Sequence, residues 1–216
     1  MPQIFQRRTN TLIRVGLLVA LVLVPVSIGA AMVVGRSSLV TGEGVTKVQP
    51  MPYSHELHVG ELGLDCRYCH SSVETSASAG IPPTKTCMNC HGMIGTESQS
   101  LEVLRASYME NTPLHWTRVH DLPDFVYFDH SIHVSKGVGC STCHGRVDQM
   151  EIVRQQVSLQ MDWCLDCHTN PEQFVRPRDA VFQMDYELPA NQAEVGRALV
   201  EEYQIQRRID CTTCHR

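Results

Sequence analysis

Cys140-Ser141-Thr142-Cys143-His144 is one of five copies of a single pattern, Cys-x-x-Cys-His, and this pattern decides the fold. The copies account for all ten cysteines of the 216-residue chain. Numbered in chain order as motifs 1 to 5, they are Cys66/Cys69/His70, Cys87/Cys90/His91, Cys140/Cys143/His144, Cys164/Cys167/His168 and Cys211/Cys214/His215. Two thiols three positions apart can each join one vinyl group of a porphyrin, and the adjacent histidine can bind the iron. The sequence therefore predicts five covalently bound haems c, with the motif histidines as proximal iron ligands.

Cysteine pairs of this spacing also occur in zinc sites and in disulfide-rich domains. The 17 residues between Cys69 and Cys87, and the 20 between Cys143 and Cys164, fit the spacing of zinc ribbons. Motif 5 would then lack a partner pair. Neither a thiolate zinc site nor a disulfide explains a histidine after every pair. We therefore expect haem iron and no zinc.

An uncharged, apolar stretch covers residues 15–35. As a helix it would be about 30 Å long, which is the thickness of the bilayer hydrocarbon. Arg7, Arg8 and Arg14 precede it and residues 1–36 contain no Asp or Glu, so the positive-inside rule places the N-terminus in the cytoplasm. We expect a single-pass anchor in the inner membrane of a bacterium, in contact with lipid, with the haem domain on the periplasmic side. A signal peptide cleaved near residues 29–31 is the alternative.

Charge is unevenly distributed along the chain. Four of the 18 basic residues lie in residues 1–36, so the remainder has 14 basic and 23 acidic residues, a formal charge of −9. Such an acidic chain is a poor match for the phosphates of nucleic acid, and we expect no nucleic-acid partner. A basic patch on a partner protein and a merely solvated acidic surface are both compatible with this charge.

The 180 residues after residue 36 provide about 36 for each haem, too few to bury a conventional apolar core beside five large cofactors. We expect a mostly irregular and α-helical multihaem cytochrome c domain with a haem-filled core, in which short helices carry the motifs. Apolar residues at helical spacing predict two further helices, over residues 99–109 and 190–207. The predicted organisation is a cytoplasmic N-terminus (1–14), a transmembrane helix (15–35), a linker (36–52) and the haem domain (53–216).

The haem domain contains an internal repeat. Tyr53-Ser54-His55-Glu56-Leu57-His58 precedes motif 1, and Phe128-Asp129-His130-Ser131-Ile132-His133 precedes motif 3. Each aromatic-x-His-x-x-His element is followed by two motifs. Residues 53–91 (repeat A) and 128–168 (repeat B) are therefore predicted to be copies of one dihaem unit, with motif 5 appended at residues 211–215.

Six histidines remain for the distal faces of the five irons. Within each repeat two of them stand three positions apart, so that one short helix can serve two neighbouring haems. The predicted distal ligands are His55, His58, His120, His130 and His133. His115 is one alternative to His120 for the fifth iron, and is otherwise expected at the surface or in support of a ligand. A methionine is the alternative for one iron, whose reduction potential it would raise; the candidates are Met93, Met109, Met150, Met161 and Met184.

The aromatic-x-His-x-x-His element ahead of Cys-x-x-Cys-His resembles the class III multihaem cytochromes. In that class the first histidine ligates the haem of the following motif and the second reaches another haem. The resemblance implies that His55 serves motif 1 and His130 serves motif 3, while His58 and His133 bind other haems.

The whole chain resembles the pentahaem cytochrome subunits of bacterial alternative complex III. The resemblance rests on the N-terminal anchor, the five motifs and the runs at residues 116–134 and 161–168, notably Arg118-Val119-His120 and Met161-Asp162-Trp163. It implies an electron-transfer subunit, not an enzyme by itself, of a respiratory or photosynthetic membrane complex that oxidises quinol. Its partners would be iron-sulfur and other membrane subunits, and a soluble periplasmic acceptor or a terminal oxidase.

Two other functions share these features. A membrane-anchored multihaem quinol dehydrogenase oxidises quinol itself, but usually carries its first motif soon after the anchor, whereas 30 residues separate Gly35 from Cys66 here. A multihaem reductase needs an iron with one open position. The lysine-substituted haem motif common in such reductases is absent from this sequence.

Overall fold

The computed structural model describes residues 6–215 and divides into two units, residues 1–42 and 43–216. The described part of the first unit consists of α1 (Arg7–Gly35) and α2 (Ser38–Thr41). Of the predicted cytoplasmic N-terminus, residues 1–5 lie outside the described residues. Residues 7–14 belong to α1, which begins at Arg7, and the division between cytoplasmic N-terminus and membrane span stays a prediction. No Gly or Pro interrupts the chain between Arg7 and Val15, so the helix continues through its charged first turns.

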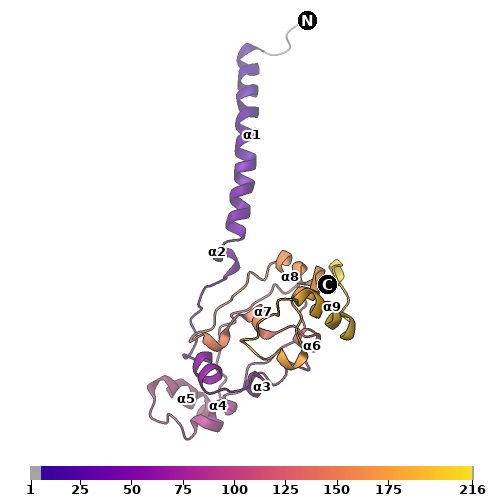
Figure 1. Ribbon diagram of the computed structural model, residues 1–216. Coiled ribbons are helices and arrows are strands. Elements are labelled where there is room, and N and C mark those ends of the chain that lie inside the picture. Colours follow the sequence, from indigo (N-terminus) through magenta and orange to yellow (C-terminus); the bar gives the residue numbers. More distant parts are fainter. Residues whose placement is uncertain (1–5, 216) are drawn as a thin grey trace. The chain divides into compact units, whose positions relative to one another are not determined.

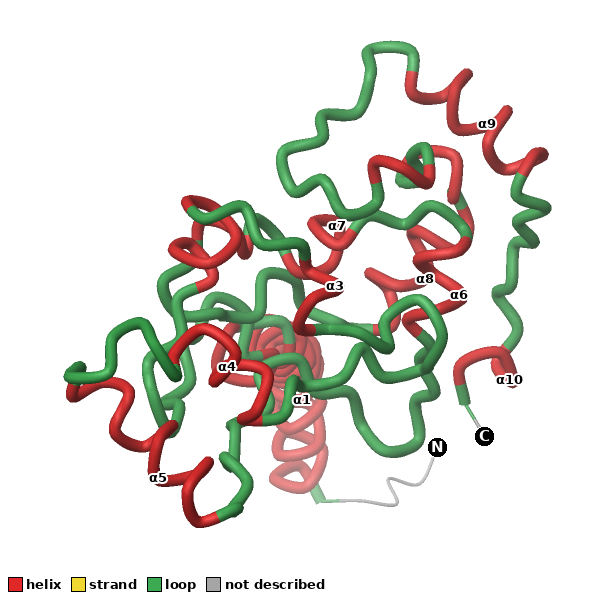
Figure 2. Tube along the Cα trace, turned by 90° about the horizontal axis from the view of Figure 1, so that it is seen from below, coloured by secondary structure: helices red, strands yellow, loops and turns green. Residues whose placement is uncertain are grey.

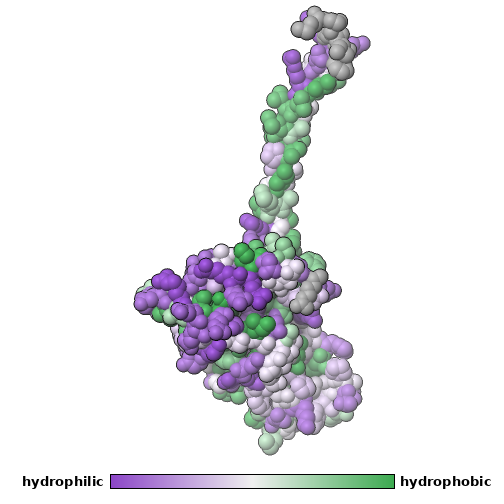
Figure 3. Space-filling model, turned by 90° about the vertical axis from the view of Figure 1, so that its right-hand side faces the viewer, coloured by the Kyte–Doolittle hydropathy of each residue, from purple (hydrophilic) through white to green (hydrophobic). Residues whose placement is uncertain are grey.

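Helix α1 is long and apolar enough to cross a membrane. Apolar side chains cover most of its length (Figure 3). A signal sequence near an N-terminus passes the same test of length and composition, so α1 is either a membrane anchor or such a sequence.

The second unit is built from short helices and long loops (Figure 1, Figure 2). Its α-helices are α3 (Cys66–Cys69), α4 (Thr84–His91), α5 (Glu102–Glu110), α6 (His130–Ser135), α7 (Cys140–His144), α8 (Met161–Thr169), α9 (Gln192–Glu202) and α10 (Cys211–Cys214). Its 3-10 or π turns are η1 (Glu56–Glu61), η2 (Gln99–Leu101), η3 (Val147–Gln149), η4 (Pro171–Gln173) and η5 (Arg178–Ala180). Residues 6–215 contain no β-strand, and their isolated β-bridges join Thr46 to Arg154, Val126 to His215 and Val138 to Val175.

Helices occur where the sequence predicts them. All five motifs lie on helices, α3, α4, α7, α8 and α10. The predicted helix at 99–109 is η2 followed by α5, and the one at 190–207 is α9. Helix α9 ends at Glu202, earlier than predicted, because Gln204 adopts a left-handed backbone with φ of 52°, which a helix cannot continue.

The apolar core of the second unit is small. One cluster of buried side chains joins Val175, Leu199 and Tyr203, close to where α9 packs on η4. Ten apolar side chains are buried in residues 6–215: Met51, Val73, Leu104, Met150, Val175, Ala180, Val181, Met184, Leu199 and Tyr203. A domain of this length ordinarily buries a larger core of its own. The expected fold class, a mostly irregular and helical domain without a conventional core, is confirmed.

Candidate haem centres

One helical turn fixes each motif histidine beside its two thiols. In motif 1 the N–H of His70 donates to the carbonyl of Cys66 at 2.9 Å, and in motif 5 the N–H of His215 donates to Cys211 at 2.9 Å. Asp65 caps the first of these helices by accepting from the N–H of Arg67 at 2.8 Å. Cysteines three positions apart on a helix share one side, so both sulfurs of a motif can reach the same porphyrin.

All ten cysteines are unpaired thiols. Burial, and after it the neighbouring Cys66 thiol, raises the pKa of Cys140 to about 11. Burial and the neighbouring Cys167 raise the pKa of Cys143 to about 12. These sulfurs are therefore neutral at neutral pH. They are free for thioether bonds to haem.

The two aromatic-x-His-x-x-His elements have the same geometry. The Tyr53 ring lies edge-on to His55 at 4.8 Å and stacks on His58 at 4.6 Å. Phe128 lies edge-on to His130 at 4.8 Å and stacks on His133 at 4.5 Å. In each element the aromatic side chain thus holds both histidine rings in place. The predicted duplication of a dihaem unit stays a prediction, and this match supports it.

Three histidine pairs have the spacing of two ligands on opposite sides of one iron. A ring nitrogen binds a metal ion at about 2 Å, which separates the ring centroids of two opposite imidazoles by about 6 Å. The centroids of His58 and His91 are 6.0 Å apart, and those of His133 and His168 are 6.1 Å apart. The rings of His130 and His144 are 6.2 Å apart and nearly parallel, at 12°. Each pair joins a predicted distal ligand to a motif histidine.

Backbone carbonyls orient most of the histidine rings through Nδ1. The second histidine of each element contacts the carbonyl four residues earlier: His58 that of Ser54 at 2.8 Å, and His133 that of Asp129 at 2.7 Å. The same contact is made by His70 to Gly80 (2.7 Å), His91 to Ile94 (3.2 Å), His130 to Ala77 (2.8 Å), His168 to Arg208 (2.8 Å) and His215 to Phe125 (3.3 Å). An Nδ1–H that donates to a carbonyl leaves Nε2 as the nitrogen available to iron.

Buried ring nitrogens without a hydrogen-bond partner lie at the two remaining predicted distal ligands. They are Nδ1 of His55 and Nε2 of His120. Burial, and then the neighbouring His70, lowers the pKa of His55 to about 4. Such nitrogens are costly to bury unless something binds them. Together with the ring pairs and the unpaired thiols, they fit a haem at the motifs.

His120 and His144 have a different relationship. Their ring centroids are 4.3 Å apart at 73°, which is ring contact and too short for an iron between them. Burial, followed by His120 and His130, lowers the pKa of His144 to about 3, so its imidazole is neutral. The ligand role of His120 stays a prediction.

A segment from outside both repeats holds motif 5. Val126 forms a bridge with His215, and the N–H of Tyr127 donates to the carbonyl of Cys214 at 2.8 Å. The ring of Phe125 lies 5.8 Å from that of His215. Motif 5 is therefore attached to the residues just before the histidine element of repeat B.

The alternative ligands lie in varied surroundings. His115 is exposed, as expected of a surface residue. Met93, Met109 and Met161 are also exposed, whereas Met150 and Met184 are buried packing residues. Methionine ligation of one iron stays an open alternative.

Sequence reasoning missed the carbonyls that orient the rings, above all those of Ala77, Gly80 and Arg208. A backbone carbonyl carries no residue-specific signal, so no pattern could have found them. The structural role of Tyr53 and Phe128 was within reach, because both stand at the same offset from a histidine pair.

Comparison with known proteins agrees with this geometry. The family model "Cytochrome c7 and related cytochrome c" matches residues 126–216, which hold repeat B and motif 5. Residues 126–216 thus form a multihaem cytochrome c domain. Over 99 residues the cytochrome is 32% identical to the multihaem cytochrome c subunit of menaquinone reductase from Nitratidesulfovibrio vulgaris. The match covers 45% of the cytochrome and 46% of that relative, so it spans about half the length of each. The five motifs mark five c-type haems.

Proposed function

We propose that this cytochrome is the electron-transfer subunit of a membrane-bound quinol oxidoreductase of the alternative complex III type. It would relay electrons from quinol-oxidising and iron-sulfur subunits to a periplasmic acceptor or a terminal oxidase. The proposal rests above all on the three histidine pairs at 6.0, 6.1 and 6.2 Å, because paired ligands leave an iron no open position for a substrate. A haem c with two axial ligands supplies one-electron chemistry at its iron.

The residues that would hold the haems follow from the geometry. The ten motif cysteines would bind the porphyrins, and His70, His91, His144, His168 and His215 would be the proximal ligands. His58 would pair with His91, His133 with His168 and His130 with His144. His55 and His120, whose ring nitrogens are buried without a partner, would complete the distal set.

Helix α1 would anchor the cytochrome in the inner membrane, with Arg7, Arg8 and Arg14 on the cytoplasmic side and residues 43–216 on the periplasmic side. The domain divisions at residues 14, 35 and 52 are part of the same proposal. An anchored haem domain would stay close to partner subunits that react with quinol inside the bilayer.

The relative supports a link to quinones and suggests that electrons could run the other way. Its name describes a menaquinone reductase, a complex that delivers electrons to menaquinone. A second candidate function is therefore the same relay in reverse, from a periplasmic donor to a quinone-reducing subunit.

The test is to purify the tagged full-length cytochrome from membranes of its native host, both with its co-purifying subunits and stripped of them. Menaquinol is added without oxygen and the absorbance of reduced haem is followed. We expect reduction by menaquinol only in the intact complex. Equal reduction of the stripped cytochrome would overturn the proposal in favour of a quinol dehydrogenase that works alone. Oxidation of reduced haem by menaquinone, without reduction by menaquinol, would establish the reverse direction.

A further inference from the structure

We propose that the five motifs form one unbranched row in space, in the order 2–1–3–4–5, so that the electron donor and the electron acceptor dock at motif 2 and motif 5. The roles given to the two ends rest on the proposed electron-transfer function. The order of the motifs rests on contacts within residues 43–216. It differs from the order of the motifs in the sequence, because motifs 1 and 2 exchange places.

Motif 2 touches motif 1 directly. The side-chain amide of Asn89, between the cysteines of motif 2, donates to the hydroxyl of Tyr68, between those of motif 1, at 3.0 Å. The ring pair of His58 and His91 ties motif 2 to the histidine element of the same repeat. Within residues 6–215 the side-chain hydrogen bonds and ring contacts of α4 reach repeat A, Ile94 and α5, and the only other motif among these partners is motif 1. Motif 2 therefore has one neighbouring motif and is an end of the row.

Motifs 1 and 3 are brought together because each repeat packs its histidine element on the other repeat. The histidine element of repeat B packs on the loop after motif 1: Nδ1 of His130 contacts the carbonyl of Ala77 at 2.8 Å, and the N–H of Ser131 donates to Ser76 at 3.2 Å. The histidine element of repeat A packs on the segment after motif 3, where the N–H of Glu56 donates to Met150 at 3.1 Å. Each repeat thus packs its histidine element on the segment that follows the first motif of the other repeat. This contact places motif 3 beside motif 1.

The order of motifs 3, 4 and 5 follows from contacts within repeat B and with the C-terminal segment. The rings of His130 and His133, held by one Phe128, face His144 of motif 3 and His168 of motif 4. Nδ1 of His168 contacts the carbonyl of Arg208 at 2.8 Å, three residues before motif 5 begins. Motif 4 is therefore the link between motif 3 and motif 5.

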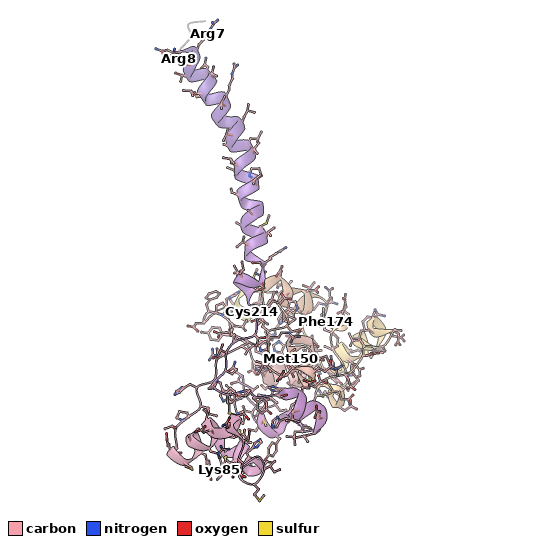
Figure 4. The ribbon with its side chains drawn as sticks, turned by 90° about the vertical axis from the view of Figure 1, so that its left-hand side faces the viewer. Arg7, Arg8, Lys85, Met150, Phe174 and Cys214 are labelled. Atoms are coloured by element: carbon pink, nitrogen blue, oxygen red, sulfur yellow. The ribbon has the colours of Figure 1, made fainter. Side chains whose placement is uncertain are left out.

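The figures show the same succession. In both the view of Figure 1 and the perpendicular view of Figure 2, the motif helices follow one another from α4 through α3 and α7 to α8 and the C-terminus. In Figure 4, Lys85 on α4 and Cys214 on α10 lie at opposite ends of the unit, with Met150 between them. Two docking sites at opposite ends of one row let the two partners bind at the same time.

The direct test measures distances between nitroxide labels by pulsed dipolar electron paramagnetic resonance in the five-haem protein. The protein is kept reduced, because low-spin ferrous iron is diamagnetic and leaves the nitroxides as the paramagnetic centres. Single cysteines replace three exposed residues: Thr75→Cys after motif 1, Lys85→Cys beside motif 2 and Gln206→Cys before motif 5. The row predicts a longer distance from 85 to 206 than from 75 to 206. The reverse order, which motifs arranged in sequence order would give, overturns the proposal. Neither distance depends on quinol, so this test can fail while the proposed function stands.

A second test removes one haem at a time and injects electrons at the motif 5 end, from a photosensitiser on Gln206→Cys. Loss of motif 2 (Cys87→Ala with Cys90→Ala) removes an end, and the four remaining haems should be reduced at the rate seen in the five-haem protein. Loss of motif 1 (Cys66→Ala with Cys69→Ala) should isolate motif 2, so that one quarter of the absorbance change moves to a slower phase. A slower phase on loss of motif 2, with an unchanged rate on loss of motif 1, would contradict the row. Haem content is measured on each variant. If either variant binds fewer than four haems, the distances between the nitroxide labels alone decide whether the row is correct.

Discussion

His133 and His168 lie with their ring centroids 6.1 Å apart, although His133 precedes motif 3 and His168 closes motif 4. His58 and His91 repeat this relationship at 6.0 Å in the other half of the domain. In both pairs the first histidine is stacked on an aromatic ring and bonded through Nδ1 to a carbonyl four residues earlier. Four rings are thus held with Nε2 available and with room for an iron between the members of each pair.

Replacing His133 by alanine should leave one of five irons with a single axial ligand. We expect a high-spin signal from one fifth of the haem in the oxidised protein, seen by electron paramagnetic resonance, with all five haems still attached. His115→Ala, at an exposed position, is the matched control and should leave the spectrum low-spin. A low-spin spectrum for His133→Ala would show that His133 is not a ligand.

The aromatic residue of each element should stabilise the domain by a similar amount. Phe128→Leu and Tyr53→Leu each remove a ring that contacts two histidines, at a cost of about 1 kcal/mol. Such a loss lowers the Tm by about 2–4 °C in a protein of this size, measured by thermal denaturation of the haem-loaded protein. Tyr53→Phe keeps the ring and is the control. A large effect in one repeat and none in the other would contradict their equivalence.

A buried arginine should tune the haem of motif 3. Arg176 is only 4% exposed, and its Nη2 lies 3.2 Å from the hydroxyl of Ser141 and 3.4 Å from that of Thr142, inside motif 3. Its Nε is buried without a partner. Reduction removes one positive charge from the iron, so a nearby cation favours the reduced state.

Arg176→Leu should therefore lower the midpoint potential of one haem, by on the order of tens of millivolts, in a potentiometric titration. The exposed Arg197→Gln is the control. An unchanged set of five potentials in a correctly folded Arg176→Leu protein would exclude this role.

Close packing of α9 on η4 should tolerate no added methyl group. A Cβ at Gly196 would collide with the backbone carbonyl of Glu172. We expect Gly196→Ala to destabilise the domain by about 2 kcal/mol or more, because backbone cannot move aside as a flexible side chain can. Ala198→Ser, on the exposed face of α9, should be nearly neutral. Equal denaturation midpoints for the two variants would show that α9 does not pack as described.

The sequence was a good guide to local structure and a poor one to assembly. Spacing within each motif places its helix, and the apolar stripes predict α5 and α9, because these features depend on residues close together in the chain. The end of α9 at Glu202 differs from prediction, since it depends on the backbone conformation of one residue, Gln204. The pairing of histidines was suggested only by family resemblance, because it depends on how separate segments of the chain pack together, as when the carbonyl of Ala77 orients His130.

The central claim is that this chain is a relay of five haems whose irons all carry two protein ligands. The most direct test is the electronic spectrum of the purified, haem-quantified, reduced protein, recorded with and without carbon monoxide. The account predicts five low-spin haems and no change on adding carbon monoxide. A haem that binds carbon monoxide would have an open or weakly held position, and would contradict a pure relay in favour of catalysis at that iron.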